Sequence, residues 1–270
     1  MFRPVEKKSL ATSVFEQLRD HIVRGEARPG DALPSERVLS EKLKVNRGAV
    51  REGLRRLEQA GLVAVSQGGA TQVLDFTRTA GLELLGALVV REGRVDTRVA
   101  RSILELRSAL GPEVARACAR RRATGALPKI VAEMRAANGD AKRLSELAMS
   151  FWAEVVRGAD GLAWQLAFNS LRASYGLVEE HLAEVMLEEH ASTAEYARLA
   201  DVIAAGDEAA AAKVAGALVV RGQRAFAHVL DAIDREDGEG SARATKEKGS
   251  TAKRVTKAGA AVAAKKGRGR

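Results

Sequence analysis

Residues 33–61 read LPSERVLSEKLKVNRGAVREGLRRLEQAG and contain the signals for two short helices joined by a tight turn. Ser35 and Asn46 are residue types whose side chains accept hydrogen bonds from the free N–H groups at the start of a helix. Gly61 is the residue type that follows a helix in the left-handed conformation. Apolar residues recur at intervals of three and four between Asn46 and Gly61, as on the buried face of an amphipathic helix. The stretch therefore predicts a helix-turn-helix.

The second helix carries arginines at steps of four, and a glycine-tipped segment follows it. Arg47, Arg51 and Arg55 share one face, and residues 62–74 predict a β-hairpin with the tip Ser-Gln-Gly-Gly. An arginine at the start of a helix in the major groove can contact guanine or hold phosphate. A helix pair with a solvated basic face would also show the arginines. The order of cap, turn, cap, glycine and hairpin instead favours a winged helix that binds DNA.

Residues 9–76 resemble the N-terminal winged-helix domain of the GntR family of bacterial transcription regulators. The resemblance is carried mainly by PGD at 29–31, LPSER at 33–37, VRE at 50–52 and GLV at 61–63. It implies DNA contacts from the arginine after the Pro-Ser-Glu turn, from the start of the second helix and from the hairpin tip. In this chain those positions are Arg37, Asn46, Arg47, Gly48, Ala49, Arg51, Gln67 and Gly68. The family often has Ser or Thr where Gly48 and Ala49 stand.

From Thr79 onward the apolar residues keep a helical period, and we find no strand pattern among them. We expect six or seven helices in an antiparallel bundle, with Pro112 kinking or breaking the longest. The fold class is thus mainly α, with a small β-hairpin wing. The all-helical body is similar to that of the FadR subfamily, on LELRSAL at 104–110 and IAAGD at 203–207. The expected domains are residues 1–76, 77–236 and a tail over 237–270.

The net charge of +9 belongs to the tail. Residues 241–270 hold ten Lys or Arg and one acid, so the first 240 residues are neutral overall. The segment 237–270 has almost no large apolar side chains, and we expect it to be disordered. It would either add salt-dependent contacts to DNA phosphates or serve only to keep the protein in solution.

The resemblance also implies a metal site, because most FadR-subfamily members hold a metal in the bundle with one Asp and three His. In this chain those four positions fall at Ala148, Trp152, Tyr196 and near Leu218. Carboxylate and imidazole, the usual ligands, are gone from all four. We therefore expect neither a metal nor another cofactor.

The replaced ligands predict an apolar cavity, which suits an acyl chain better than a small carboxylate. Fatty-acid-responsive members of the subfamily, which residues 69–82 resemble, also lack the metal and bind long-chain acyl-CoA. The resemblance thus implies an acyl-CoA or lipid-like effector. The expected pocket residues are Arg107, Trp152, Tyr175, Tyr196 and Leu218. Another small molecule and a cavity filled by its own side chains remain alternatives, and Arg107 is either an anion contact or a structural arginine paired with an acid.

These features predict a sequence-specific transcription regulator that binds double-stranded DNA as a homodimer on a palindromic operator. A non-sequence-specific architectural DNA-binding protein would explain the tail but not a helical body with a cavity. The sequence offers no paired carboxylates, metal cluster or Ser/Cys–His set for an enzyme. A lone Cys118 and the lack of an apolar run of about 18 residues indicate the reducing cytoplasm and no membrane contact. Repression and activation both remain open.

Overall fold

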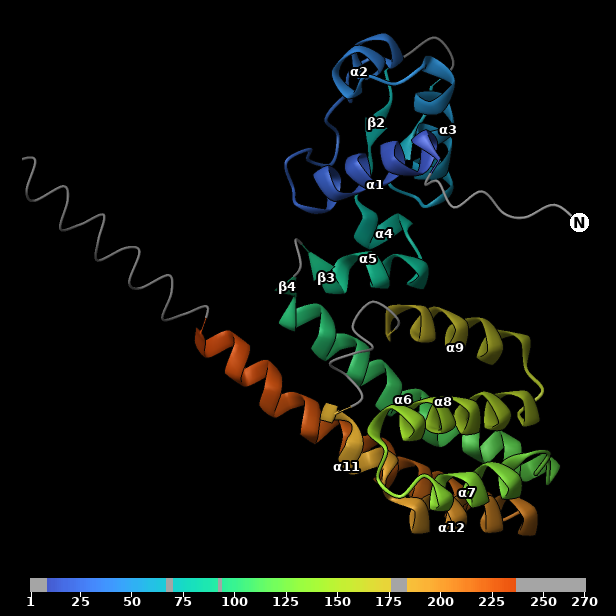
Figure 1. Cartoon of the computed structure of the whole chain (residues 1–270). Coiled ribbons are helices and arrows are strands. Elements are labelled where there is room, and N and C mark those ends of the chain that lie inside the picture. The colour runs from blue at the N-terminus through green and yellow to red at the C-terminus, as the bar shows by residue number, and fades with distance from the viewer. Residues whose placement is uncertain (1–8, 67–69, 92–93, 176–183, 237–270) are drawn as a thin grey trace, which may run out of the picture.

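The computed structural model describes residues 9–66, 70–91, 94–175 and 184–236. Gln67, Gly68 and the expected tail over 237–270 lie outside these ranges. A small N-terminal unit, here called the head, lies at one end of the molecule, and a larger helical body lies at the other (Figure 1). A short connecting segment joins the two.

The head contains three helices and a two-stranded sheet: α1 (Leu10–Val23), α2 (Glu36–Leu43), α3 (Arg47–Gln59), β1 (Val63–Ala64) and β2 (Gln72–Val73). The expected caps are confirmed, because the side chains of Ser35 and Asn46 accept hydrogen bonds from the backbone N–H groups of Val38 and Ala49. Lys44 adopts a left-handed conformation with φ of 53° and makes the turn between α2 and α3. The predicted helix-turn-helix is therefore present.

The wing is an antiparallel hairpin in which Val63 pairs with Val73. Gly61, which precedes it, has a φ of +67°, and an added Cβ there would collide with the Thr79 carbonyl oxygen. The Thr79 hydroxyl also donates a 2.6 Å hydrogen bond to the Gly61 carbonyl oxygen. The glycine is thus required both by the turn and by the close approach of the connecting segment.

The connecting segment contains α4 (Phe76–Thr79), η1 (Leu82–Leu84), α5 (Leu85–Val89), β3 (Val90–Arg91) and β4 (Arg94–Val95). Its side chains belong to two cores: Leu84 and Leu88 pack with the head, whereas Val89 belongs to a core of the body with Ile103 and Leu171. The domain boundary between residues 76 and 77 stays a prediction; Leu84 and Leu88, which follow it in the chain, pack with the head that precedes it. The antiparallel pair β3–β4 corrects the expectation that strands are absent after Thr79. Two-residue strands are too short to produce a detectable period of two.

The body contains α6 (Thr97–Arg121), α7 (Leu127–Ala136), α8 (Ala141–Gly158), α9 (Leu162–Tyr175), α11 (Leu187–His190), α12 (Thr193–Ala205) and a last described helix over 208–236. Its main core is built from α6, α7, α8, α12 and the last helix. At its centre the rings of Phe151 and Tyr196 meet edge to face, 4.9 Å apart. The predicted mainly α fold is confirmed.

Pro112 does not break α6, contrary to the expectation of a possible break. Gly111 and Pro112 lie against the last helix, where an added Cβ on Gly111 would be 3.0 Å from Val219. Packing against that helix compensates for the hydrogen bond that proline cannot donate. The helical period expected after Thr79 includes α9 (Leu162–Tyr175), and residues 176–183 lie outside the described part.

Candidate functional site

The start of α3 forms an exposed basic end of the head. Asn46 Oδ1 accepts a 2.8 Å hydrogen bond from the Ala49 N–H and so fixes the first turn. Arg47 and Gly48 are exposed, whereas the Ala49 side chain is only 9% exposed and faces the head core. Among these residues, Arg47 alone presents a long charged side chain to solvent.

The other two arginines predicted to bind DNA are paired with carboxylates. Arg51 holds Glu36 with Nη2 3.1 Å from Oε2, and Arg37 holds Glu41 at 2.8 Å. The Arg47 side chain, in contrast, has no hydrogen bond or ion pair with any residue in the described ranges. Of the three arginines predicted to contact DNA, Arg47 is the one whose guanidinium is not paired with a carboxylate.

Arg47, Arg51 and Arg55 act on the same carboxylate. The pKa of Glu36 is lowered mainly by its hydrogen bond with Arg51, and the positive charges of Arg47 and Arg55 lower it further. Arg55 is exposed on the same helix but was not among the predicted contacts. Its position four residues after Arg51, on the same face of the helix, could have indicated that it also faces DNA. The predicted wing-tip contacts Gln67 and Gly68 lie outside the described residues.

The body contains a cavity of about 360 Å³ between α6, α8, α9 and the last helix. This volume is at the lower end of the range of about 300–1,000 Å³ for small-molecule sites. Its walls are largely apolar, with α9 running alongside α8 (Figure 1). The apolar lining residues are Leu110, Val114, Ala148, Met149, Val156, Ala167, Phe168, Leu171, Met186 and Val219.

Arg107 lines the cavity and forms a buried ion pair with Glu189. Its Nη1 lies 2.9 Å from Glu189 Oε2, and its Nη2 pairs with Glu189 Oε1. The Glu189 side chain is fully buried, and the Tyr196 hydroxyl donates a 3.4 Å hydrogen bond to it. Of the two roles open to Arg107, the structure shows the pairing with an acid; sequence alone could not identify a partner 82 positions away.

The structure brings only some of the predicted pocket residues to the cavity. Arg107 and Trp152 line it. Tyr196 and Leu218 are 0% and 1% exposed in the main core and are not part of this lining. The side chain of Tyr175 lies outside the described part of the chain. Val219 lines the wall in place of its neighbour Leu218.

His190 lines the cavity and was not predicted to do so. Its ring is 7% exposed, and its Nδ1 has no hydrogen-bond partner among the described residues. Burial lowers the pKa of His190 to about 4, and the charge of Arg107 acts in the same direction against that of Glu189. The imidazole is therefore neutral at physiological pH.

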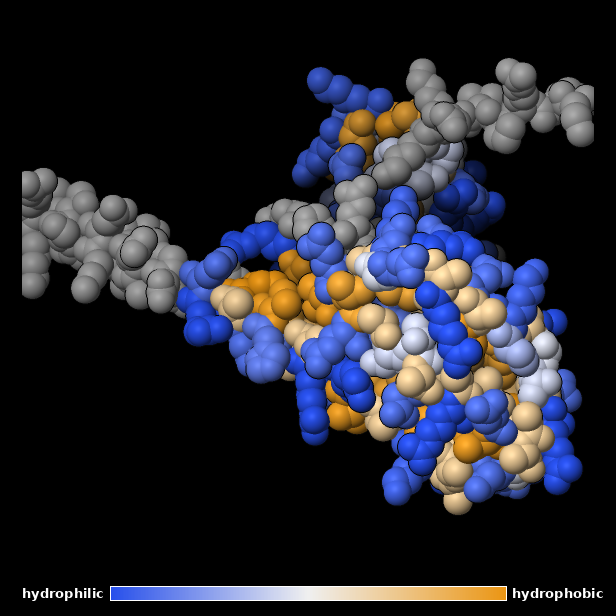
Figure 2. All heavy atoms as spheres, turned by 60° about the horizontal axis from the view of Figure 1, so that its bottom comes forward, coloured by the Kyte–Doolittle hydropathy of each residue, from blue (hydrophilic) through white to orange (hydrophobic). Residues whose placement is uncertain are grey.

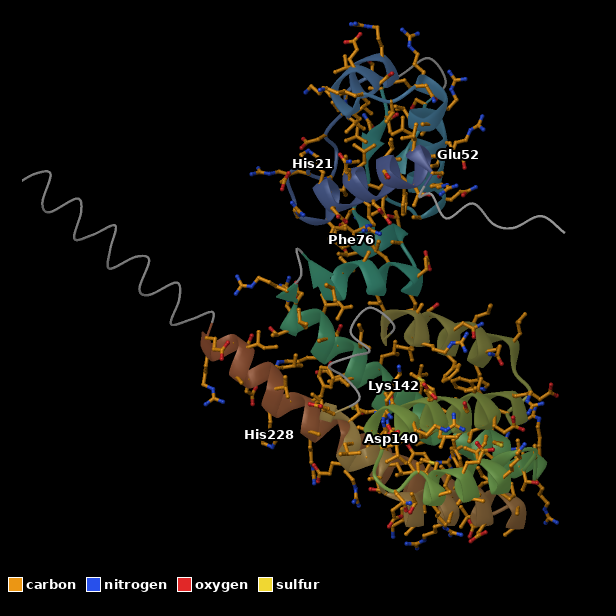
Figure 3. The ribbon with its side chains drawn as sticks, in the orientation of Figure 1. His21, Glu52, Phe76, Asp140, Lys142 and His228 are labelled. Atoms are coloured by element: carbon orange, nitrogen blue, oxygen red, sulfur yellow. The ribbon has the colours of Figure 1, made fainter. Side chains whose placement is uncertain are left out.

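The positions that hold the metal in the subfamily do not fit one here. Ala148, Trp152 and Leu218 have no metal-binding donor, and burial raises the pKa of Tyr196 well above its ordinary value, so its phenol stays protonated. His21 and His228 lie far apart, in the head and on the last helix (Figure 3). Among the described residues, no three His, Cys, Asp or Glu side chains gather as a metal site.

The geometry defines a class: a winged-helix DNA-binding head joined to a helical domain with a small-molecule cavity. The family model described as "Bacterial regulatory proteins, gntR family" matches residues 10–73, and the model of the FCD domain matches residues 102–221. The chain belongs to the GntR family of bacterial transcription regulators, with an FCD domain as its body. It is a DNA-binding regulator, and FCD domains bind small-molecule effectors. No helix in the described part is long and apolar enough to span a membrane.

Relatives and structures agree with this assignment. The HTH-type transcriptional regulator Mce2R of Mycobacterium tuberculosis is 40% identical over 215 residues, which cover 79% of this chain and 90% of Mce2R. The fatty acid metabolism regulator protein of Vibrio cholerae is 32% identical over 108 residues, 40% of this chain and 39% of that protein. The structure of Lar, which controls the agr system of Listeria monocytogenes, has a TM-score of 0.53 at 16% identity and covers 82% of this chain and 98% of its own. That likeness shows the fold.

Proposed function

We propose that this regulator binds a two-fold symmetric operator as a homodimer and that an acyl-type molecule in the body cavity sets its affinity for DNA. The proposed effector rests on the apolar cavity of about 360 Å³, whose wall includes Ala148 and Trp152, two of the four positions that the subfamily resemblance assigns to a metal. Moving an acyl chain from water into such a cavity is favourable, whereas a small polar metabolite would not form matching contacts with most of the apolar wall. The similarity to a fatty acid metabolism regulator supports the same ligand class.

The DNA half of the proposal rests on the exposed start of α3. One recognition helix contacts too few base pairs for a specific site, so two heads on half-sites about one DNA turn apart are expected. Arg47 would contact base edges or phosphate. The other DNA contacts expected in the helix-turn-helix are Arg37, Asn46, Gly48, Ala49 and Arg51. The body supplies exposed apolar side chains for a second copy, and Figure 2 shows a hydrophobic patch near the end of the last described helix.

The cavity and the head have a physical connection through α9. Trp164, Phe168 and Leu171 of α9 line the cavity, and α9 also packs against η1 and α5. Leu84 and Leu88 of that segment in turn pack with the head core. A ligand that shifts α9 would therefore move the segment on which the head rests. If the ligand binds one arrangement of α9 and the head more tightly than another, it shifts the protein toward that arrangement and so changes the spacing of the two heads of the dimer.

Native mass spectrometry of the full chain tests the effector proposal. We expect a co-purified acyl-type species, or uptake of added acyl-CoA at one molecule per chain. Bound zinc or nickel, or a protein that takes up neither acyl-CoA nor a fatty acid derivative, would contradict it. Uptake of a different small molecule instead would favour a non-lipid effector.

DNase footprinting separates the regulator from the architectural alternative. A dimeric regulator protects defined sites with two-fold symmetry, whereas an architectural protein protects DNA uniformly. The proposal contains no catalytic step. Because the operator is part of the bacterial chromosome, we place the protein in the cytoplasm.

A further inference from the structure

We propose that the cavity holds an uncharged polar head group through Trp152 and His190, and that Glu189 excludes carboxylates. The ligand class is then an acyl amide or alcohol, whose head group both accepts and donates a hydrogen bond, rather than a free fatty acid. This inference rests on the proposed role of the cavity as the effector site.

Two polar atoms in the cavity wall are incompletely hydrogen-bonded. Trp152 Nε1 and His190 Nδ1 belong to side chains that are 8% and 7% exposed. His190 Nδ1 has no hydrogen-bond partner among the described residues, and the Trp152 N–H has the Tyr196 hydroxyl beside it but without the geometry of a hydrogen bond. Both side chains line the cavity. A buried donor or acceptor without a partner is costly, so such atoms mark places where a ligand group completes the hydrogen bonding.

The two atoms lie at the same end of the cavity. Trp152 is beside the Tyr196 hydroxyl, which donates to Glu189, and His190 follows Glu189 directly in α11. The end lined by Arg107, Trp152 and His190 is called the polar end below; Glu189 and Tyr196 lie behind this lining, where Glu189 pairs with Arg107. Phe168 and the other apolar residues of the lining would hold the hydrocarbon chain.

The polar end contains no spare positive charge for a carboxylate. Arg107 is the charged donor there, and both of its terminal nitrogens are engaged by the fully buried Glu189. A ligand carboxylate would be placed next to Glu189, where like charges repel strongly away from water. The fit of Glu189 is close, since an added Cβ on Gly222 of the last helix would collide with its Oε2.

The other charged residues of the wall do not supply a positive charge for a ligand carboxylate either. Arg172 is exposed to solvent, so its charge is largely screened. Glu146 is paired with Arg143 at 3.2 Å. His190 is neutral, as shown above. A neutral carbonyl accepts from the Trp152 N–H, and an amide or hydroxyl hydrogen is donated to His190 Nδ1 when the proton of the ring is on Nε2.

The test compares three probes that share an eight-carbon chain: octanamide, octanoate and octylammonium. Their dissociation constants for the delipidated full chain are measured by calorimetry at pH 7.5. We expect octanamide to bind about tenfold or more tightly than either ion, because an unpaired ion is costly in an apolar site. Octanoate that binds as tightly as octanamide overturns the inference but leaves the proposed effector site standing. If none of the three binds, both proposals fail.

Three variants assign the roles. Trp152→Phe keeps the ring but removes the N–H, and we expect it to weaken octanamide about threefold to tenfold with little effect on octanoate. Phe168→Leu is the matched control in the apolar wall and should weaken all three probes by a similar factor. Equal losses for octanamide and octanoate in Trp152→Phe would contradict a hydrogen-bonding role.

Glu189→Gln removes the charge that neutralises Arg107. We expect it to bind octanoate about tenfold or more tightly than the wild type does, and octanoate to raise its melting temperature but not that of the wild type. An unchanged preference in a folded Glu189→Gln protein would overturn the role of Glu189. If this variant does not fold, the wild-type preference and Trp152→Phe decide the inference.

Discussion

At the scale of the residue, His190 makes the stability of the body dependent on pH. Burial lowers its pKa to about 4, whereas the unfolded chain binds this proton near the ordinary value of about 6.5. The folded state therefore loses stability as the pH falls from about 6.5 to about 4, by up to about 1.4 kcal/mol per pH unit. Urea unfolding at pH 7 and pH 5 measures the loss, which should be smaller in His190→Leu.

The exposed His228 supplies the control for this experiment. His228→Leu removes an imidazole from the last helix but should leave the pH dependence of the wild type intact. A His190→Leu protein with the same loss between pH 7 and pH 5 as the wild type would show that other groups, such as the carboxylates of the surface pairs, cause it.

Cys118 is a second residue whose chemistry is set by burial. Its side chain is fully buried, its Sγ–H donates a 3.3 Å hydrogen bond to the Ala123 carbonyl oxygen, and burial raises the pKa of the thiol to about 11. The thiolate is the reactive form, so we expect iodoacetamide at pH 8 to label Cys118 only in denaturant. Mass spectrometry measures the label, and stoichiometric labelling of the folded protein would contradict the assignment.

At the scale of the element, the sequence predicted those features that depend on contacts between residues close together in the chain, such as the starts of helices. Ser35 and Asn46 cap their own helices within three residues, so α2 and α3 begin where the sequence indicates. The path of α6 through Pro112 depends instead on packing against the last helix. Glu189 as the partner of Arg107 depends on a contact between distant parts of the chain. Arg107 and Trp152 could therefore be predicted as cavity residues from the sequence, whereas Glu189 and His190 could not.

The recognition helix gives the prediction for DNA binding. Arg47→Ala removes the exposed charged side chain at the start of α3, and each lost base or phosphate contact costs about 1–3 kcal/mol. With one Arg47 per half-site, we expect specific binding to fall about a hundredfold or more. Fluorescence anisotropy on an operator selected by the wild type from random DNA measures the change.

The matched control for Arg47→Ala is Arg143→Ala, which removes the same charge from the body. Arg143 pairs with Glu133 at 2.7 Å and lies on α8, outside the head. It should bind the operator like the wild type. Near-wild-type affinity of Arg47→Ala would show that α3 does not enter the groove as proposed.

At the scale of the whole molecule, the connecting segment joins two cores that have separate tasks. Leu84 and Leu88 belong with the head and Val89 with the body, within six residues. Such a short segment has little freedom to move one core without the other. An effector that shifted α9 would therefore act on the head through packed side chains, whereas a long flexible linker would not transmit the shift.

The distribution of charge gives the prediction for the whole chain. The first 240 residues are neutral overall and residues 241–270 carry a net +9, so the tail dominates the long-range attraction to DNA. Deleting residues 241–270 should flatten the dependence of DNA affinity on salt, since each phosphate contact contributes about 0.9 to the slope of log K against log salt. The ratio of operator to random-DNA affinity should rise or stay constant, because we expect the base contacts to come from the head. Titrations of the full and shortened chains on both DNAs at several salt concentrations measure slope and ratio together, and a loss of that ratio would show that the tail takes part in recognising the operator.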